Sequence, residues 1–284
     1  MITGLKINEQ RKQMYYEKGY WGKDTVLDAW DNAVKNYGER EYVADDQGRR
    51  YTYAEVDDKA SRLASWLKEI GIEVGDVVTI QFPNWAEFTV AYVAILKVGA
   101  VIPPVPKNYN DADLTYIMNL VHAKAFICPT YFHHTDYEQQ AIDAMKECPS
   151  VKAIAVCDKF EPARYGTISL STICATHEPL QEKPEVCSDH VVVILSTSGT
   201  TGKPKAALLT HNNMLYSERI FAQEAHRGPD DVMFDCSPLN HAVGFWHGLI
   251  APMLTGGRSV LMQQYSPREA IELMNAEGVT WSMS

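Results

Sequence analysis

From residue 73 to residue 157 the sequence alternates short apolar runs with longer amphipathic segments, and this alternation constrains the fold more than any other feature. The runs VVTIQF, AVIPPV, KAFICP and VKAIAVC are apolar almost throughout, as burial on both faces of a sheet demands. The segments between them, among them LTYIMNLVHA and YEQQAIDAMKE, have the length and periodicity of helices. Strands joined by such helices predict an α/β fold with a parallel sheet that helices cover on both faces.

Local signals predict further elements on either side. The stretch YVADDQGRRYTY places polar turn residues between two β-prone runs and predicts a hairpin. Thr52 and Glu55 have the spacing of a capping box, and Asn84 with Glu87 predicts a cap for the apolar helix that follows. Prolines between residues 158 and 189 predict a surface connection. The final stretch, SPREAIELMNAEGVTWSMS, predicts a capped helix and the opening of a strand, so we expect the sequence to be part of a longer protein.

Charge and composition narrow the class of protein. The formal charge of -10 and the pI near 5.4 give no net basic surface, so a nucleic-acid partner is not expected. The first residues lack the apolar core of a signal peptide, and the longest apolar helix candidate, 88–96, is far shorter than the ~20 residues of a bilayer span. A cytoplasmic protein without an integral membrane span is predicted. The cysteines include no CxxC pair, which predicts reduced thiols and no metal site.

The stretch LSTSGTTGKPKAALLTH, Leu195 to His211, gathers hydroxyls, two glycines and two lysines between two β-prone runs. Small residues let backbone N–H groups converge on an anion, while hydroxyls and lysines add donors and positive charge, which suits a polyphosphate. The stretch is not a Walker A loop. Only two residues separate Gly199 from Gly202, and Pro204 follows Lys203 where that motif needs Ser or Thr. The alternative interpretation is a solvated hairpin turn.

ILSTSGTTGKPK resembles the phosphate-loop signature of the adenylate-forming (AMP-binding) superfamily, which includes acyl-CoA synthetases, aryl-acid ligases and peptide-synthetase adenylation domains. YTYAEVDDKASRLASWL, LKVGAVIPPV, LTHNNM and PLNHAVGFWHG resemble other segments of the family in the expected order. Ala206 departs from the glycine common there, and a strand tolerates it. The resemblance implies the large N-terminal domain of these enzymes, an α/β fold with two stacked helix-covered sheets.

The resemblance also implies domain bounds. Residues 1–284 would form an incomplete N-terminal domain, with one lobe over about 73–225 and the other over about 1–72 plus 226–284. The family's adenine-binding and magnesium-binding segment, ribose-binding aspartate, hinge and C-terminal domain with its catalytic lysine are expected beyond Ser284. The C-terminal domain would therefore be absent here, and the fragment by itself would be inactive.

The implied reaction begins when a carboxylate attacks the α-phosphate of ATP. An acyl-adenylate forms with loss of pyrophosphate, and a thiol, usually that of coenzyme A, takes the acyl group. The resemblance implies that the loop hydroxyls and amides hold the β and γ phosphates and that two lysines add charge. The residues concerned are Thr197, Ser198, Gly199, Thr200, Thr201, Gly202, Lys203 and Lys205. ATP, coenzyme A and Mg²⁺ are the expected cosubstrates and cofactor, with the Mg²⁺ ligand beyond Ser284.

PLNHAVGFWHG matches the family segment in which a histidine lies beside the carboxylate, so His241 is the candidate catalytic residue. An imidazole there can donate to the developing adenylate, and the alternative is a hydrogen-bonded core histidine. Val243, Gly244 and Phe245 are apolar or small, as an acyl pocket requires, and the same types suit a core. Gly244 in particular is expected to let the acyl chain approach the backbone.

Ala242 bears on the choice of acid. Aryl-acid ligases of the family tend to have asparagine after the motif histidine, so Ala242 disfavours dihydroxybenzoate-like acids. The N-terminal MYYEKGYWG is similar in style to those ligases and to bacterial short- and medium-chain acyl-CoA synthetases, a group that includes the crotonobetaine/carnitine ligases. We favour an aliphatic acid with coenzyme A. An aryl-acid ligase that loads a carrier protein and a non-catalytic nucleotide-binding module are the alternatives, and the oligomeric state stays open.

Overall fold

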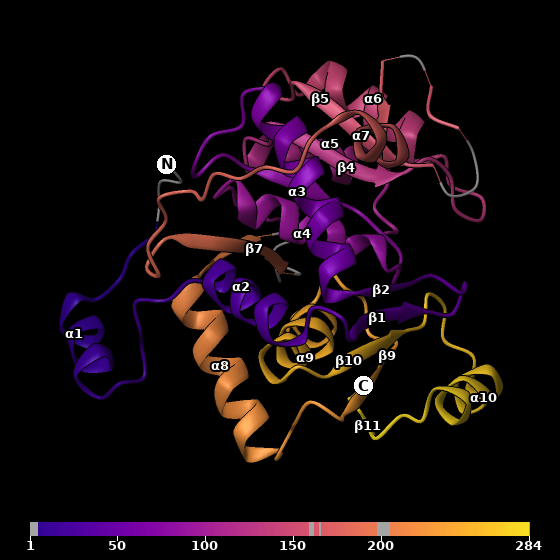
Figure 1. The fold of residues 1–284 in the computed structure, drawn as a ribbon. Coiled ribbons are helices and arrows are strands. Elements are labelled where there is room, and N and C mark those ends of the chain that lie inside the picture. Colours follow the sequence, from indigo (N-terminus) through magenta and orange to yellow (C-terminus); the bar gives the residue numbers. More distant parts are fainter. Residues whose placement is uncertain (1–4, 159–161, 165, 198–204, 284) are drawn as a thin grey trace.

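The computed structural model describes residues 5–158, 162–164, 166–197 and 205–283. Its strands form two main sheets and a hairpin, with helices around and between the sheets (Figure 1). The larger sheet has the order β11-β9-β10-β1-β2, the second has the order β3-β4-β5-β6, and β7 pairs with β8. An α/β fold built on sheets with helices over them is thereby confirmed.

The second sheet comes from the alternating part of the sequence. Its strands are β3 (Val78–Ile80), β4 (Ala125–Pro129), β5 (Ala153–Cys157) and β6 (Ile168–Ser169), and all neighbours are parallel. Helices α4 (Glu87–Lys97), α5 (Asp111–Leu120) and α6 (Tyr137–Glu147) lie between them in the chain. The prediction of a parallel sheet is therefore confirmed.

The run AVIPPV is not a continuous strand, contrary to the prediction. It makes only isolated bridges, from Val101 to Val77 and from Pro104 to Ile80 on one side, and from Ile102 to Val193 on the other. Pro103 and Pro104 lack N–H groups, so the segment cannot complete a regular ladder. These bridges nevertheless connect β3 to β7 (Val191–Thr197), which pairs with β8 (Lys205–Thr210).

The larger sheet combines strands from both ends of the chain. β1 (Glu41–Asp45) and β2 (Arg50–Thr52) form the predicted antiparallel hairpin, which confirms that interpretation of YVADDQGRRYTY. β1 also pairs in parallel with β10 (Arg258–Leu261), which pairs with β9 (Val232–Asp235), and β9 with β11 (Trp281–Ser282). The strand that contains Tyr51 thus lies in a different sheet from Thr79 of β3. The bounds of the two predicted lobes stay a prediction.

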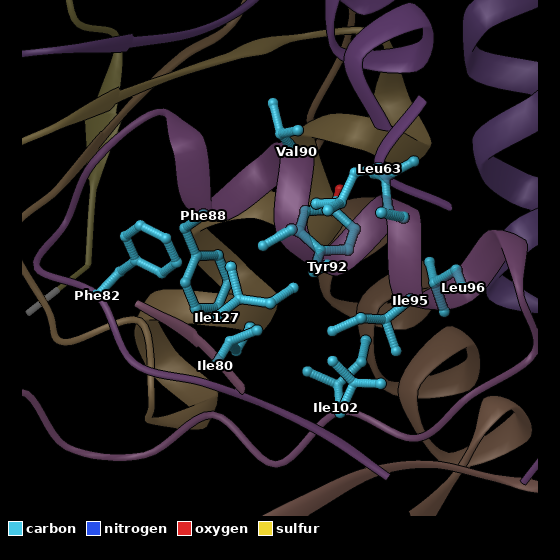
Figure 2. Close-up of a cluster of buried hydrophobic side chains, with 14 of the residues drawn as sticks. Leu63, Ile80, Phe82, Phe88, Val90, Tyr92, Ile95, Leu96, Ile102 and Ile127 are labelled. Carbon is cyan, nitrogen blue, oxygen red and sulfur yellow. The ribbon is translucent and has the colours of Figure 1, made fainter. Parts of the chain in front are cut away.

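Helices α3 (Tyr53–Glu69) and α4 lie in the middle of the molecule between the sheets, beside α2 (Val26–Tyr37) (Figure 1). Ten of the eleven residues of α4 are buried. Figure 2 shows Phe88, Tyr92 and Ile95 of this helix together with Ile80 and Ile127 of the parallel sheet. The core is therefore centred on α4. This helix is apolar on all sides because protein, and not solvent, surrounds it on all sides.

The predicted helix caps have different outcomes. Thr52 and Glu55 form the capping box of α3, as predicted. The cap from Asn84 and Glu87 is wrong, because the N-cap of α4 is Ala86 and no side chain caps the helix. Asn84 instead hydrogen-bonds the backbone of residues 237 and 239, and Glu87 forms an ion pair with Arg49. Both polar side chains therefore bind residues that are distant in sequence and do not cap the helix.

Several of the remaining helices were not predicted. The surface connection over 158–189 contains β6 and a short helix, α7 (Leu170–Thr176), whose N-cap Ser169 accepts from the backbone of Thr172. The predicted final helix exists as α10, but Ser266 makes no capping bond, and only Gly278 ends it in the left-handed region, with φ 63°. The others are α1 (Glu9–Glu17), α8 (His211–Glu224), the π-helix η1 (Val243–Ile250), α9 (Ala251–Thr255) and α10 (Pro267–Glu277). No helix in the described ranges is long and apolar enough to cross a membrane.

Candidate active site

The strands around the glycine and hydroxyl loop are antiparallel and in register. Ser196 faces Ala206, and Thr197 faces Lys205 at the end of the ladder. The side chain of Lys205 is exposed, and the hydroxyl of Tyr109 donates to Ser196 Oγ over 3.3 Å. The pairing brings the two ends of the loop together, as a loop that converges on an anion requires. The polyphosphate substrate expected at this hairpin stays a prediction.

Most of the predicted phosphate-binding residues lie outside the described residues. These are Ser198, Gly199, Thr200, Thr201, Gly202 and Lys203. Their contacts with ATP, and the prediction that they meet His241 at one substrate, stay predictions. The hairpin turn named as the alternative is compatible with the same strand pairing.

His241 lies in the bend between β9 and η1, with an exposed side chain. Its backbone N–H donates to the carbonyl of Pro238 over 3.0 Å, and its carbonyl accepts from the N–H of Phe245 over 2.9 Å. Its ring Nδ1 accepts from the N–H of Val243 over 3.3 Å. Because Nδ1 is an acceptor there, the neutral ring carries its proton on Nε2. His241 thus presents an N–H donor, which is the group that a bound carboxylate would need, and it is not a core histidine.

The helix that follows His241 is a π-helix, η1, which the sequence did not predict. The i→i+5 pattern is rare and is frequently found at functional sites. Ala242 and Val243, at its start, are partly exposed. They remain candidates for contact with an acyl group.

Gly244 lies against the bend that precedes η1. A Cβ added to it would lie 2.5 Å from the carbonyl oxygen of Pro238 and 2.6 Å from that of Ser237. The missing side chain therefore leaves room for the preceding bend of the chain, a close approach that sequence alone could not distinguish from the approach of a ligand. The expectation that Gly244 lets an acyl chain approach the backbone stays a prediction.

Phe245 packs in the core. It is 1% exposed, and its ring packs edge-on against Phe88 at a centroid distance of 5.1 Å and tilted against Tyr92 at 5.2 Å. These contacts place Phe245 in the central core, on the side of η1 that faces α4. The core role that the sequence left open as an alternative is thus what the structure shows for Phe245, and its assignment to the acyl site stays a prediction.

Two buried carboxyl groups near η1 were missed by the sequence analysis. Asp235 is fully buried, its Oδ2 has no hydrogen-bond partner in the described part of the chain, and burial raises its pKa well above the ordinary value. Gly248 makes room for it, because a Cβ there would lie 2.1 Å from Oδ2. Glu218 of α8 is also fully buried and lies 2.9 Å from Nδ1 of His247. No periodicity or motif marks either carboxyl group.

His211 begins α8 and is buried, with its Nδ1 accepting from the N–H of Val26 over 3.1 Å. Burial, aided by His190, lowers the pKa of His211 to about 4. The ring is therefore neutral at physiological pH and serves packing and hydrogen bonding.

The six cysteines are free. Across the described residues, no group of three or more His, Cys, Asp or Glu side chains could hold a metal ion. The expectation of a Mg²⁺ ligand beyond Ser284 stays a prediction.

Most of the chain matches a known protein family. Residues 30–284 match the family model described as "AMP-binding enzyme". The chain belongs to the AMP-binding enzyme family. This confirms the resemblance of the phosphate-loop segment and of the segments around it.

Curated relatives of the family match nearly the whole chain. The chain is 38% identical over 280 residues to a medium-chain fatty-acid–CoA ligase of Escherichia coli, which covers 99% of the chain and 49% of that protein. It is 28% identical over 274 residues to a 2,3-dihydroxybenzoate-AMP ligase of Bacillus subtilis, which covers 96% of the chain and 49% of that protein. The chain thus spans about half the length of these relatives.

The fold is likewise that of the N-terminal domain of adenylate-forming enzymes. The apo structure of Mycobacterium smegmatis MbtA superimposes with a TM-score of 0.88 at 26% identity, covering 98% of this chain and 51% of MbtA. The predicted fold class is thereby confirmed.

Proposed function

We propose that the protein to which this chain belongs activates an aliphatic carboxylic acid with ATP and transfers the acyl group to coenzyme A. The observation that carries this proposal is the 38% identity to a medium-chain fatty-acid–CoA ligase across 99% of the chain. Ala242 after the motif histidine supports it, because the position offers no polar group to a ring hydroxyl.

In this reaction a carboxylate oxygen of the acid bonds to the α-phosphorus of ATP, and the bond to the pyrophosphate oxygen breaks. The thiol sulfur of coenzyme A then bonds to the acyl carbon, the bond to AMP breaks, and the thiol proton leaves. The loop over residues 197–205 would hold the leaving phosphates by backbone and hydroxyl donors, with Lys203 and Lys205 adding positive charge. His241 would donate its Nε2–H to a carboxylate oxygen and so orient the acid.

Pyrophosphate release from ATP, measured with a panel of straight-chain and aromatic acids, tests the proposal. We expect release with aliphatic acids and formation of the acyl-CoA when coenzyme A is added. Replacement of Thr200 and Thr201 together by alanine should reduce release far more than it lowers stability, because surface loops make few packing contacts. Unchanged release by a folded double variant would remove these hydroxyls from the mechanism.

The second candidate is an aryl-acid adenylating ligase that loads a carrier protein. The similarity to the 2,3-dihydroxybenzoate-AMP ligase over 96% of the chain favours it. Release of pyrophosphate with aromatic acids only, and no acyl-CoA product, would select this function over the first.

A further inference from the structure

The bend that precedes His241 is held by a side chain from the loop that follows β3. Asn84, between β3 and α4, is 4% exposed. Its Nδ2 donates to the carbonyl of Ser237 over 2.8 Å, and its Oδ1 accepts from the N–H of Leu239 over 3.3 Å. Both bonds agree with one orientation of the amide, since a flipped amide would direct a donor at a donor and an acceptor at an acceptor.

The bend is held from its other sides as well. Asp235 Oδ1 accepts from the N–H of Ser237 over 3.0 Å. The carbonyl of Pro238 accepts from the N–H of His241, and Gly244 packs directly against the carbonyls of Ser237 and Pro238. Four polar backbone groups of the bend thus have partners, and Asn84 supplies the two partners that come from outside the β9–η1 segment.

This arrangement transmits the position of Asn84 to the imidazole. The backbone of His241 is tied to Pro238, and its ring is tied to the first residue of η1 through Val243. Loss of the Asn84 bonds would free Ser237 and Leu239 and allow the bend to move, and the His241 backbone with it. The same movement would disturb the contact that keeps Nδ1 an acceptor.

We propose that Asn84 is a positioning residue for His241, which it holds through the bend over 237–239 so that Nε2–H points at the carboxylate of the acid. The role of His241 toward the acid rests on the proposed function. The effect of Asn84 on the position of the His241 ring does not. Within the described residues, the hydrogen bonds of the Asn84 side chain go to this bend and not to β7 or β8. Loss of the Asn84 side chain should therefore impair the use of the acid and leave the binding of ATP unchanged.

Trp85 provides a matched control. It follows Asn84 in the same loop, is fully buried, and also reaches a distant segment, where its Nε1 donates to Gln263 Oε1 over 2.8 Å. Trp85→Phe removes a long-range hydrogen bond from the same loop, and this bond goes to the segment after β10 and not to the 237–239 bend. A purely structural role of Asn84 would make the two variants behave alike.

Two variants of Asn84 separate its donor from its acceptor. Asn84→Asp keeps the acceptor for Leu239 and sets an oxygen against the Ser237 carbonyl in place of the donor, while Asn84→Ala loses both bonds. For the acid we expect kcat/KM to fall by about tenfold or more in each variant, because each loses at least one buried hydrogen bond to the bend. KM for ATP should stay within about twofold, and Trp85→Phe should change neither value by more than about twofold. Because Asn84→Ala risks misfolding, circular dichroism and thermal unfolding accompany each variant, and Asn84→Asp decides if Asn84→Ala does not fold.

A second measurement does not depend on activity. In protein labelled with ¹⁵N-histidine, two-bond nitrogen–proton correlations identify the tautomer of each ring, and His241→Gln assigns the His241 signal. We expect the Nε2–H form in the wild type and in Trp85→Phe, and a mixture of forms in Asn84→Asp. An unchanged His241 signal in Asn84→Asp, or equal losses of acid and ATP kinetics in the Asn84 and Trp85 variants, would overturn the inference. The proposed function and this inference can fail separately. If the wild type released no pyrophosphate with any acid, the proposed function would be overturned. If Asn84→Asp still lost the single tautomer, Asn84 would remain the residue that positions the ring.

Discussion

Helices α4 and α10 have the same length, eleven residues, but opposite environments. Ten residues of α4 are buried, whereas Ala270 is the only buried residue of α10. In Figure 1, α4 lies at the centre between the sheets and α10 at the margin, where it covers the outer side of the five-stranded sheet. The comparison teaches that helix length predicts nothing about burial, while the distribution of apolar residues does. EFTVAYVAILK is apolar on all sides, and PREAIELMNAE is apolar along one stripe.

The largest expected effect lies on the inner helix. Phe88→Ala should lower the free energy of unfolding by about 3–5 kcal/mol, because the ring is buried against Phe245 and Tyr92 and its removal leaves a cavity. Urea unfolding measures the loss. A loss below 1 kcal/mol would show that the centre of the molecule can collapse around the missing ring, and the contrast with α10 would fail.

The second effect depends on pH and concerns His211, which lines a cavity of about 40 Å³ with Leu96 at the end of α4. Its pKa is about 4 when folded and 6.5 ordinarily, so the unfolded chain binds the proton first as the pH falls. The stabilising contribution is present above pH 6.5 and is lost between 6.5 and about 4, with a maximum of about 3 kcal/mol. His211→Gln cannot titrate, so unfolding measured from pH 7.5 to 4.5 should show a smaller decline. An identical decline in both proteins would contradict the assignment.

The third effect compares the glycines that end the two helices. Gly99 and Gly278 both have left-handed backbones, with φ 70° and 63°. A Cβ on Gly99 would lie 2.8 Å from Val186 and 2.9 Å from Pro184, whereas one on Gly278 meets nothing within 4 Å. Both alanine variants carry the left-handed strain of about 1–2 kcal/mol, and Gly99→Ala should lose about 1–3 kcal/mol more through overpacking. Equal losses in thermal unfolding would mean that the chain around 184–186 yields without cost.

The smallest effect lies on the outer helix. Ile271 of α10 is 58% exposed, so Ile271→Ala should change the free energy of unfolding by no more than about 0.5 kcal/mol. The same urea unfolding used for Phe88→Ala measures it. A loss of 2 kcal/mol or more would show that α10 contacts something over this side chain.

Much of the fold could be predicted from local patterns. The parallel sheet followed from runs such as KAFICP, and the capping box of α3 followed from Thr52 and Glu55, because these signals depend on neighbours within a few residues. Where the local patterns misled or gave no signal, prolines stand in or near the segment. α7 is a short helix among prolines, and AVIPPV has a strand-like composition but lacks the N–H groups for a ladder.

For the candidate site, the sequence by itself determined the family, and it predicted the phosphate-loop segment and His241 as site residues, because these are carried by residue types at fixed spacing. Only the tertiary structure decided what the neighbours of His241 do. Gly244 packs on Pro238, Phe245 joins the core, and Asn84 reaches the bend from the loop that follows β3. In the sequence, a glycine that leaves room for a ligand cannot be distinguished from one that leaves room for the backbone. The same holds for an asparagine that caps a helix and one that hydrogen-bonds a distant segment. The difference lies in which distant atoms occupy the space beside them, and that is fixed when the two sheets pack together.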